Sequence, residues 1–104
     1  MCVGAHVYKY VYDWSMQFEW DENKRRSNLT KHGFDFLDAS QVFEGPTWTF
    51  EDDRFAYGEQ RFITMGLLKG RVMVIAHTES ENNVRVISMR ERTKHEQVIF
   101  FENL

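Results

Sequence analysis

Alternation of apolar and polar residues predicts five strands, and the last three follow one another closely. Lys69-Gly70 is a two-residue turn signal, and residues 80–83 form a second polar turn. Such short connections predict an antiparallel meander in the second half of the chain. The expected strands are residues 17–20, 47–50, 61–68, 71–79 and 84–90.

Three helices are expected around these strands. Asp21 is a candidate N-cap and Gly33 a candidate C′ glycine, so a helix is predicted over 22–32. Leu29 is its only strongly apolar residue, which favours a helix lying flat at the edge of a sheet or bundle. The other two helices are predicted over 35–43 and 92–102. This order predicts an α+β domain with two N-terminal helices and a C-terminal helix packed on an antiparallel β-meander.

Regular alternation assigns faces within the last two strands. It places Val84, Val86 and Ser88 on one face of the last strand and Arg85, Ile87 and Met89 on the other. The turn at 80–83 predicts a register in which His77 lies about opposite Ser88.

The first fifteen residues differ from the rest. Residues 6–12 have the composition of a strand but a weak pattern. We therefore expect residues 1–15 to form an N-terminal arm, or a translated upstream segment with Met16 as the usual start, and residues 16–104 to form the domain.

Composition excludes several classes of protein. With 104 residues, 42% of them hydrophobic and 15% aromatic, the chain suits one folded domain rather than a disordered protein. The single cysteine, Cys2, excludes a disulfide framework and a Cys-rich zinc site. Histidine pairs with metal-ligand spacing are absent, so neither a metal nor a cofactor is expected. Apolar runs are too short for a membrane span and no signal peptide is visible, so we expect a cytoplasmic protein that does not contact membranes.

The charge is unevenly distributed along the chain. The formal net charge is −3, which argues against a protein that coats nucleic acid with its whole surface. However, residues 1–53 hold five Lys or Arg against ten Asp or Glu, whereas residues 54–104 hold eight against six. We therefore predict a polarised surface with a basic face from the second half.

The densest polar cluster lies on and just after the last predicted strand. Arginine binds phosphate through paired hydrogen bonds, and histidine moves protons near neutral pH, so such a cluster suits a phosphodiester substrate. Metal-free RNA cleavage needs a base, an acid and a cation for the phosphate. The candidates are Arg85, Arg90, Arg92, Lys94 and His95, with His77 and Glu79 on the preceding strand.

Plainer interpretations exist for most of these residues. Exposed arginines on edge strands usually form a solvated surface, and a histidine among apolar strand residues is more often structural than catalytic. Asp52 and Asp53 suit a solvated loop, and His32 suits a cation at the C-terminus of a helix.

Several short motifs follow one another along the chain. They are Phe18-Glu19-Trp20-Asp21, Asn28-Leu29-x-Lys31-His32-Gly33, Phe36…Ala39…Val42-Phe43, Asp53-Arg54-x-x-Tyr57-Gly58-Glu59-x-Arg61 with Gly66 beyond it, and Arg85-Val86-Ile87-Ser88-x-Arg90-x-x-Thr93-x-x-Glu96. Each motif alone is weakly specific, but in this order and spacing they resemble the BrnT family of type II toxins over roughly residues 16–102.

The resemblance implies a fold similar to the RelE-like ribonuclease toxins and a metal-independent RNA endonuclease that inhibits translation and growth. It also implies a BrnA-type antitoxin that carries a DNA-binding domain, so that operator DNA is contacted only through the complex. With the cluster above, the expected catalytic residues are Arg85, Arg90, His77 and Glu79. The expected RNA-binding residues are Lys31, His32, Arg54, Ser88, Arg92 and Lys94.

Three positions depart from the family's pattern. Met89 and Arg92 stand where small residues are common, and Glu91 stands where a base is frequent. These departures, with the acidic first half, leave a second interpretation open. In it the domain is a catalytically weak binding module that mainly sequesters its antitoxin and co-represses the operon.

Overall fold

The computed structural model describes residues 7–8 and 16–104. The predicted arm or extension at 1–15 therefore lies outside the described residues except for Val7 and Tyr8. The strands are β1 (Val7–Tyr8), β2 (Gln17–Trp20), β3 (Thr47–Glu51), β4 (Phe62–Leu68), β5 (Arg71–Ser80) and β6 (Asn83–Glu91). The helices are α1 (Glu22–His32), the short 3₁₀ helix η1 (Phe36–Asp38), α2 (Ala39–Glu44) and α3 (Lys94–Glu102).

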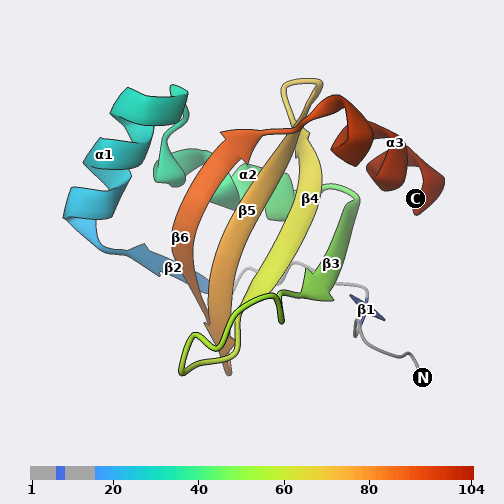
Figure 1. Ribbon diagram of the computed structural model, residues 1–104. Helices are drawn as coiled ribbons and strands as arrows, with labels where there is room; N and C mark the ends of the chain where they lie inside the picture. Colours follow the sequence, from blue (N-terminus) through green and yellow to red (C-terminus); the bar gives the residue numbers. More distant parts are fainter. Residues whose placement is uncertain (1–6, 9–15) are drawn as a thin grey trace.

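The strands form one sheet in the order β1-β3-β4-β5-β6-β2. Strands β3 to β6 are antiparallel neighbours, which confirms the predicted meander (Figure 1). Strand β2 joins the far edge parallel to β6, with Phe18 beside Val84. The tight turn between β4 and β5 places Lys69 and Gly70 at positive φ, a conformation that glycine adopts readily.

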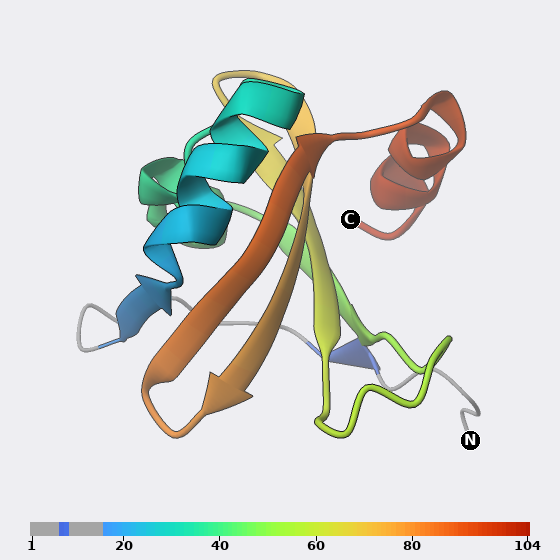
Figure 2. The same cartoon turned by 60° about the vertical axis from the view of Figure 1, so that its left-hand side comes forward.

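The helices lie on both sides of the sheet and do not all pack on the meander, so that part of the fold prediction is wrong. Helices α1 and α2 lie on one side and α3 on the other (Figures 1 and 2). The physical reason is that both faces of the sheet are apolar and each needs a cover. Phe36, Val42 and Phe43 pack against one face, and Phe100 of α3 packs against the other.

The predicted helix over 35–43 is divided. Asp35 caps η1 by accepting a hydrogen bond from the Leu37 N–H, and after Asp38 the chain starts again as α2. Helix α3 begins at Lys94 rather than 92. The Arg92 N–H still donates to the Val72 carbonyl at 3.0 Å, which keeps that residue tied to the sheet.

Helix α1 has the predicted bounds. The Asp21 carboxylate accepts from two backbone N–H groups of the first turn, and Gly33 at φ 80° closes the last turn on the Leu29 carbonyl. The helix lies along β6, and its Asn28 side chain donates to the Met89 carbonyl of that strand (Figure 1). Within the described residues, no helix is long and apolar enough to cross a membrane.

Candidate functional site

The candidate site lies on the face of the sheet that bears α3. Directly opposed residues of antiparallel strands share a face, and Val74 pairs with Arg90 while Thr78 pairs with Arg85. Both arginines therefore project from the α3 side. Arg90 helps to line a pocket of about 160 Å³ together with Phe50, Arg54, Ile63, Val74 and Glu96.

A bulge at Ile87 changes the register of β6. Ala76 pairs with Ser88 and the next residue, His77, pairs with Val86, so Ile87 is skipped in the ladder. The predicted pairing of His77 with Ser88 is therefore wrong by two residues of β6.

The bulge also changes the predicted faces. Val86 and Met89 both point into the core beside α2, although they are three residues apart. Ser88 and Arg90 join Arg85 on the α3 side. The expectation that Met89 shares a face with Arg85, and Ser88 with Val86, is wrong because strict alternation fails at the extra residue.

Arg90 is held by Glu96 from the first turn of α3. Two parallel hydrogen bonds of 2.8 Å join the guanidinium to the carboxylate. The same carboxylate accepts from the Thr93 N–H, which completes a capping box at the start of α3. The Arg90 hydrogen bonds lower the pKa of Glu96 to about 2, and Glu96 in turn raises the pKa of Arg90. At neutral pH the pocket therefore contains an ion pair.

Arg54 is held by Asp52 in the loop between β3 and β4. Its Nε and Nη2 donate to the Asp52 carboxylate at 2.8 and 3.0 Å, and the Tyr57 hydroxyl donates to it at 2.9 Å. Asp52 is only 7% exposed, so the solvated-loop interpretation is wrong for this residue. The hydrogen bond from Arg54 is the main cause of the lowered pKa of Asp52.

Arg85 reaches the same loop. Its Nη2 donates to Glu59 at 2.8 Å, and Arg61 donates to the other oxygen of that carboxylate at 3.1 Å. The Arg61 guanidinium also lies over the Tyr57 ring, 4.2 Å from its centroid. Three predicted arginines of this face are therefore each paired with a different carboxylate. Arg54 pairs with Asp52, Arg85 with Glu59, and Arg90 with Glu96.

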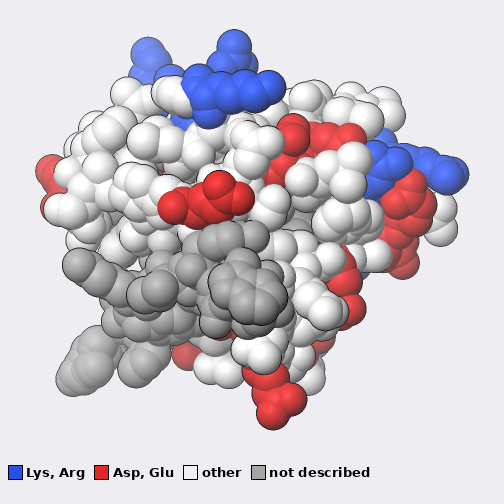
Figure 3. All heavy atoms as spheres, turned by 180° about the vertical axis from the view of Figure 1, so that it is seen from behind, with Lys and Arg blue, Asp and Glu red and all other residues white. Residues whose placement is uncertain are grey.

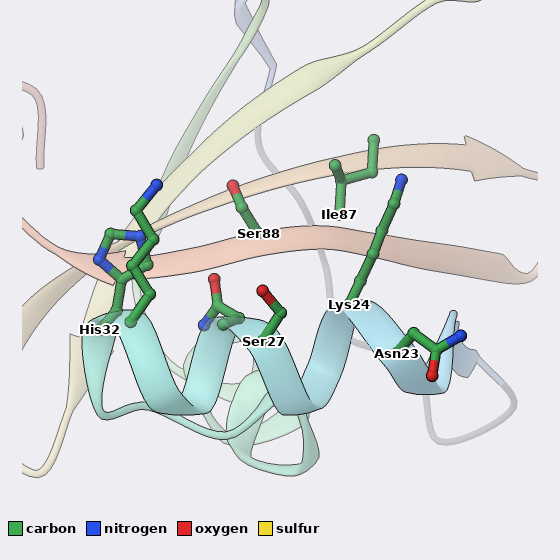
Figure 4. A pocket seen from close by; sticks show the side chains of 8 residues that line it. Asn23, Lys24, Ser27, His32, Ile87 and Ser88 are labelled. Atoms are coloured by element: carbon green, nitrogen blue, oxygen red, sulfur yellow. The ribbon is translucent and has the colours of Figure 1, made fainter.

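A second concave site lies between α1 and β6. It has a volume of about 480 Å³ and brings together Lys31, His32 and Ser88, three of the predicted RNA-binding residues. Figure 4 shows Lys24, Ser27 and His32 rising from α1 toward β6, where Ser88 and Ile87 complete the lining. We refer to this site as the α1–β6 groove. Ser88, at the β6 side of the groove, lies two residues before Arg90 on the same face of the strand.

Arg92 and Lys94 lie where β6 leads into α3. Arg92 is half-buried and its Nε donates to the side chain of Gln97, whereas Lys94 is exposed in the first turn of α3. They follow Arg90 along the chain but do not line its pocket.

His77 lies on the opposite face of the sheet from these arginines. It is completely buried between Phe62, which stacks on its ring, and Phe43, which meets it edge-on. Its Nε2 and the Thr64 hydroxyl are 2.7 Å apart, and that hydroxyl lies 2.7 Å from the hydroxyl of Thr49. A buried polar row therefore crosses three strands beneath α2.

Burial lowers the pKa of His77 to about 4, so the imidazole is neutral at physiological pH. Its Nδ1 lies 3.5 Å from Glu79, further along β5 on the same face. The structure thus brings His77 and Glu79 together but separates both from Arg54, Arg85 and Arg90.

The side of the molecule that bears α2 is not uniformly basic. Seen from the side of α2, Lys and Arg gather at the upper rim and at one side of the described surface, and much of the rest is uncharged or acidic (Figure 3). Across the described residues, no three His, Cys, Asp or Glu side chains are grouped like the ligands of a metal ion.

Sequence reasoning missed several residues of the two sites. Asp52, Glu59 and Glu96 are the partners of the arginines, and Lys24 lines the α1–β6 groove. The signal for Glu96 was present as Thr93-x-x-Glu96, a capping-box pattern that also marks the true start of α3. A comparable local signal does not exist for Glu59, whose role depends on a residue 26 positions away.

Comparison with known families shows a match over most of the chain. The model of the family described as "Ribonuclease toxin, BrnT, of type II toxin-antitoxin system" matches residues 20–96, which include both sites. Comparison with curated proteins yields no match.

Proposed function

Because this chain belongs to the BrnT family of ribonuclease toxins of type II toxin–antitoxin systems, we propose that it is a metal-independent endoribonuclease that acts on the α3 side of its sheet. Family membership implies an RNA substrate and an antitoxin partner. We also propose the RelE-like fold that the resemblance implies, which the antiparallel β3–β6 meander supports.

The observation that carries the proposal is the convergence of Arg54 and Arg90 on one pocket. In our proposal these two guanidinium groups bind the scissile phosphate and stabilise the charge of the pentavalent transition state, with Arg85 holding a neighbouring phosphate. The apolar wall formed by Ile63 and Val74 strengthens such interactions, because it keeps water away from one side of the pocket.

Glu96 is the proposed acceptor for the 2′-OH proton. Its pKa is low because Arg90 donates to it, so a phosphate that takes over Arg90 would raise that pKa and make the carboxylate a better base. The 2′ oxygen then attacks phosphorus and the bond to the 5′ oxygen breaks. The products are a 2′,3′-cyclic phosphate and a 5′-hydroxyl that takes its proton from water.

The other predicted residues have structural or RNA-binding roles in this proposal. His77 and Glu79 stabilise the sheet, because both lie on the face opposite the arginine pocket and His77 is also completely buried. Lys31, His32 and Ser88 bind the RNA backbone along the α1–β6 groove, and Lys24 joins them there. Arg92 and Lys94 extend this basic surface toward α3.

Cleavage in the presence of EDTA tests the proposal. Purified protein is incubated with RNA, and the ends of the products are identified. We expect cleavage without divalent metal, a cyclic phosphate end, and at least a hundredfold loss of rate in Arg90→Ala. Arg26→Ala is the matched control, because Arg26 is exposed on α1 and does not line either site. Cleavage that requires magnesium would overturn the mechanism.

The proposed partner is a BrnA-type antitoxin with a DNA-binding domain, so that operator DNA is contacted only by the complex. The excess of acidic residues in the first half of the chain supports docking of a basic antitoxin segment. Purified toxin alone should not retard operator DNA in a gel, whereas the complex should.

The alternative function is a catalytically weak module that sequesters its antitoxin. The carboxylates that occupy all three arginines favour it, because they compete with phosphate. Expression without antitoxin separates the two functions. Growth arrest supports the ribonuclease, whereas normal growth with folded protein in the cells supports the binding module.

A further inference from the structure

Phe55 is an exposed aromatic residue beside the arginine pocket. Its side chain is 65% exposed, more than any other large apolar side chain in the described part of the chain. It lies in the loop between β3 and β4, next to Arg54, whose guanidinium carbon is 5.7 Å from the centre of its ring. In Figure 2 this loop leaves the foot of the sheet on the same side as α3.

The loop that carries Phe55 is firmly held. The Asp52 N–H donates to the Arg61 carbonyl at 2.8 Å, which closes the base of the loop. The buried Asp52 carboxylate then accepts from Arg54 and Tyr57 inside it. An anchored loop can present a ring at a small entropic cost on binding.

Phe55 also belongs to a row of contacting rings and guanidinium groups. Its ring meets the Tyr57 ring edge-on, with 5.7 Å between the two centroids, and the Arg61 guanidinium lies over the Tyr57 ring. The row therefore offers an exposed ring at one end and cations along its length. Unpaired nucleobases bind to such platforms by stacking, while nearby arginines hold the backbone.

We propose that Phe55 stacks against the unpaired base of the nucleotide next to the phosphate held by Arg54 and Arg90. The inference rests on the proposed function for the identity of the substrate as RNA. It adds that the preferred substrate is single-stranded at this nucleotide, since a paired base could not present its face to the ring.

Other exposed apolar residues lack this setting. Phe101 on α3 is 52% exposed, but its ring contacts Phe100 instead of an arginine. It is therefore the matched control, an exposed phenylalanine that can be truncated without touching the loop.

Binding of a non-cleavable oligonucleotide tests the proposal. A labelled 2′-O-methyl oligonucleotide cannot undergo 2′-OH attack, and a second backbone of equal length that lacks bases carries the same phosphates. We expect Phe55→Ala to weaken binding of the first by roughly five- to 150-fold, the range for one stacked base. Binding of the baseless backbone should be unchanged. Phe55→Trp should retain affinity, and Phe101→Ala should bind like the parent protein.

Two outcomes would overturn the inference. Equal weakening on both backbones would show that Phe55 acts through the loop and not through a base. Unchanged oligonucleotide binding together with weaker antitoxin binding would make Phe55 part of a protein interface. Thermal unfolding of each variant checks that the domain is folded. Failure of the proposed ribonuclease would appear separately, as a lack of RNA cleavage by the parent protein.

Discussion

The side chain of Asn28 and the backbone of Met89 exchange two hydrogen bonds across 61 residues of sequence. The Asn28 amide donates to the Met89 carbonyl at 2.7 Å, and its oxygen accepts from the Met89 N–H at 3.1 Å. Strand β2 ends at Trp20, opposite Val86, so the edge of β6 beyond that point is paired by a side chain of α1. Asn28 also donates to the Phe34 carbonyl, which ties the end of the helix to the same point.

We predict that Asn28→Ala lowers the free energy of unfolding by about 2–4 kcal/mol, because buried backbone groups lose their partners. Chemical denaturation measures this change. Asn28→Asp keeps the volume but cannot donate, so it should also be destabilised. Asn23→Ala, an exposed change in the same helix, should stay within about 0.5 kcal/mol of the parent protein. A loss of less than about 1 kcal/mol in Asn28→Ala would mean that side-chain packing, and not this pair of hydrogen bonds, holds α1 against β6.

The buried His77 predicts a loss of stability in mild acid. Its pKa is about 4 in the folded protein and near 6.5 when the chain is unfolded. Between these values the unfolded state binds a proton that the folded state does not, so stability is full above pH 7 and falls as the pH decreases. The loss at pH 5 should be about 2 kcal/mol. Denaturation at pH 7.5 and pH 5 measures it.

The control for this prediction is His77→Gln, which offers a neutral hydrogen-bonding group at the same position. Its stability should vary less between the two pH values than that of the parent protein. The carboxylates with lowered pKa, such as Glu96, titrate mainly below pH 5. They therefore contribute little to the difference in stability between pH 7.5 and pH 5. An unchanged pH dependence in the variant would show that other groups cause it.

Gly66 should not tolerate a side chain. A Cβ there would lie 2.6 Å from Cγ1 of Val42 and 3.1 Å from Cγ2 of Thr47, where α2 packs on β4. We expect Gly66→Ala to cost about 1–3 kcal/mol. Val42→Ala removes the nearest atom, so the double variant should be more stable than the sum of the single changes by about 1 kcal/mol. If the two changes in the free energy of unfolding simply add, the strain in Gly66→Ala does not come from contact with Val42.

Glu96→Gln separates binding from chemistry at the arginine pocket. Glutamine preserves the capping box but removes the charge that holds Arg90. If Glu96 accepts the 2′-OH proton, kcat should fall by roughly a hundredfold while KM decreases. Steady-state kinetics on a short RNA measures both. A fall in kcat/KM through KM alone would assign Glu96 to substrate binding only.

Local signals in the sequence were sufficient for several elements. The caps of α1 at Asp21 and Gly33 depend on neighbouring residues, and both ends of that helix are where they were predicted. The Lys69-Gly70 turn likewise determines how β4 and β5 pair, so the meander follows from short connections. These features depend on residues only a few positions apart, so a local sequence pattern is enough to predict them.

The features that were missed depend on contacts across the fold. The bulge at Ile87 has no sequence signal, yet it decides on which face Ser88 and Arg90 lie. Asp52 looked like a solvated loop residue because the pattern could not show that Arg54 and Tyr57 enclose it. His77 could be described from sequence as either structural or catalytic, and only its burial on the far face separates those roles.

The carboxylates paired with Arg54, Arg85 and Arg90 have a consequence for the proposed recognition of RNA. If RNA binds as proposed, its phosphates must displace the carboxylates of Asp52, Glu59 and Glu96 from the three arginines. The affinity for RNA would then fall less steeply with salt concentration than it would for three unpaired arginines. The reason is that the carboxylates already neutralise part of the arginine charge. A protein of net charge −3 could in this way bind RNA phosphates locally without binding polyanions in general.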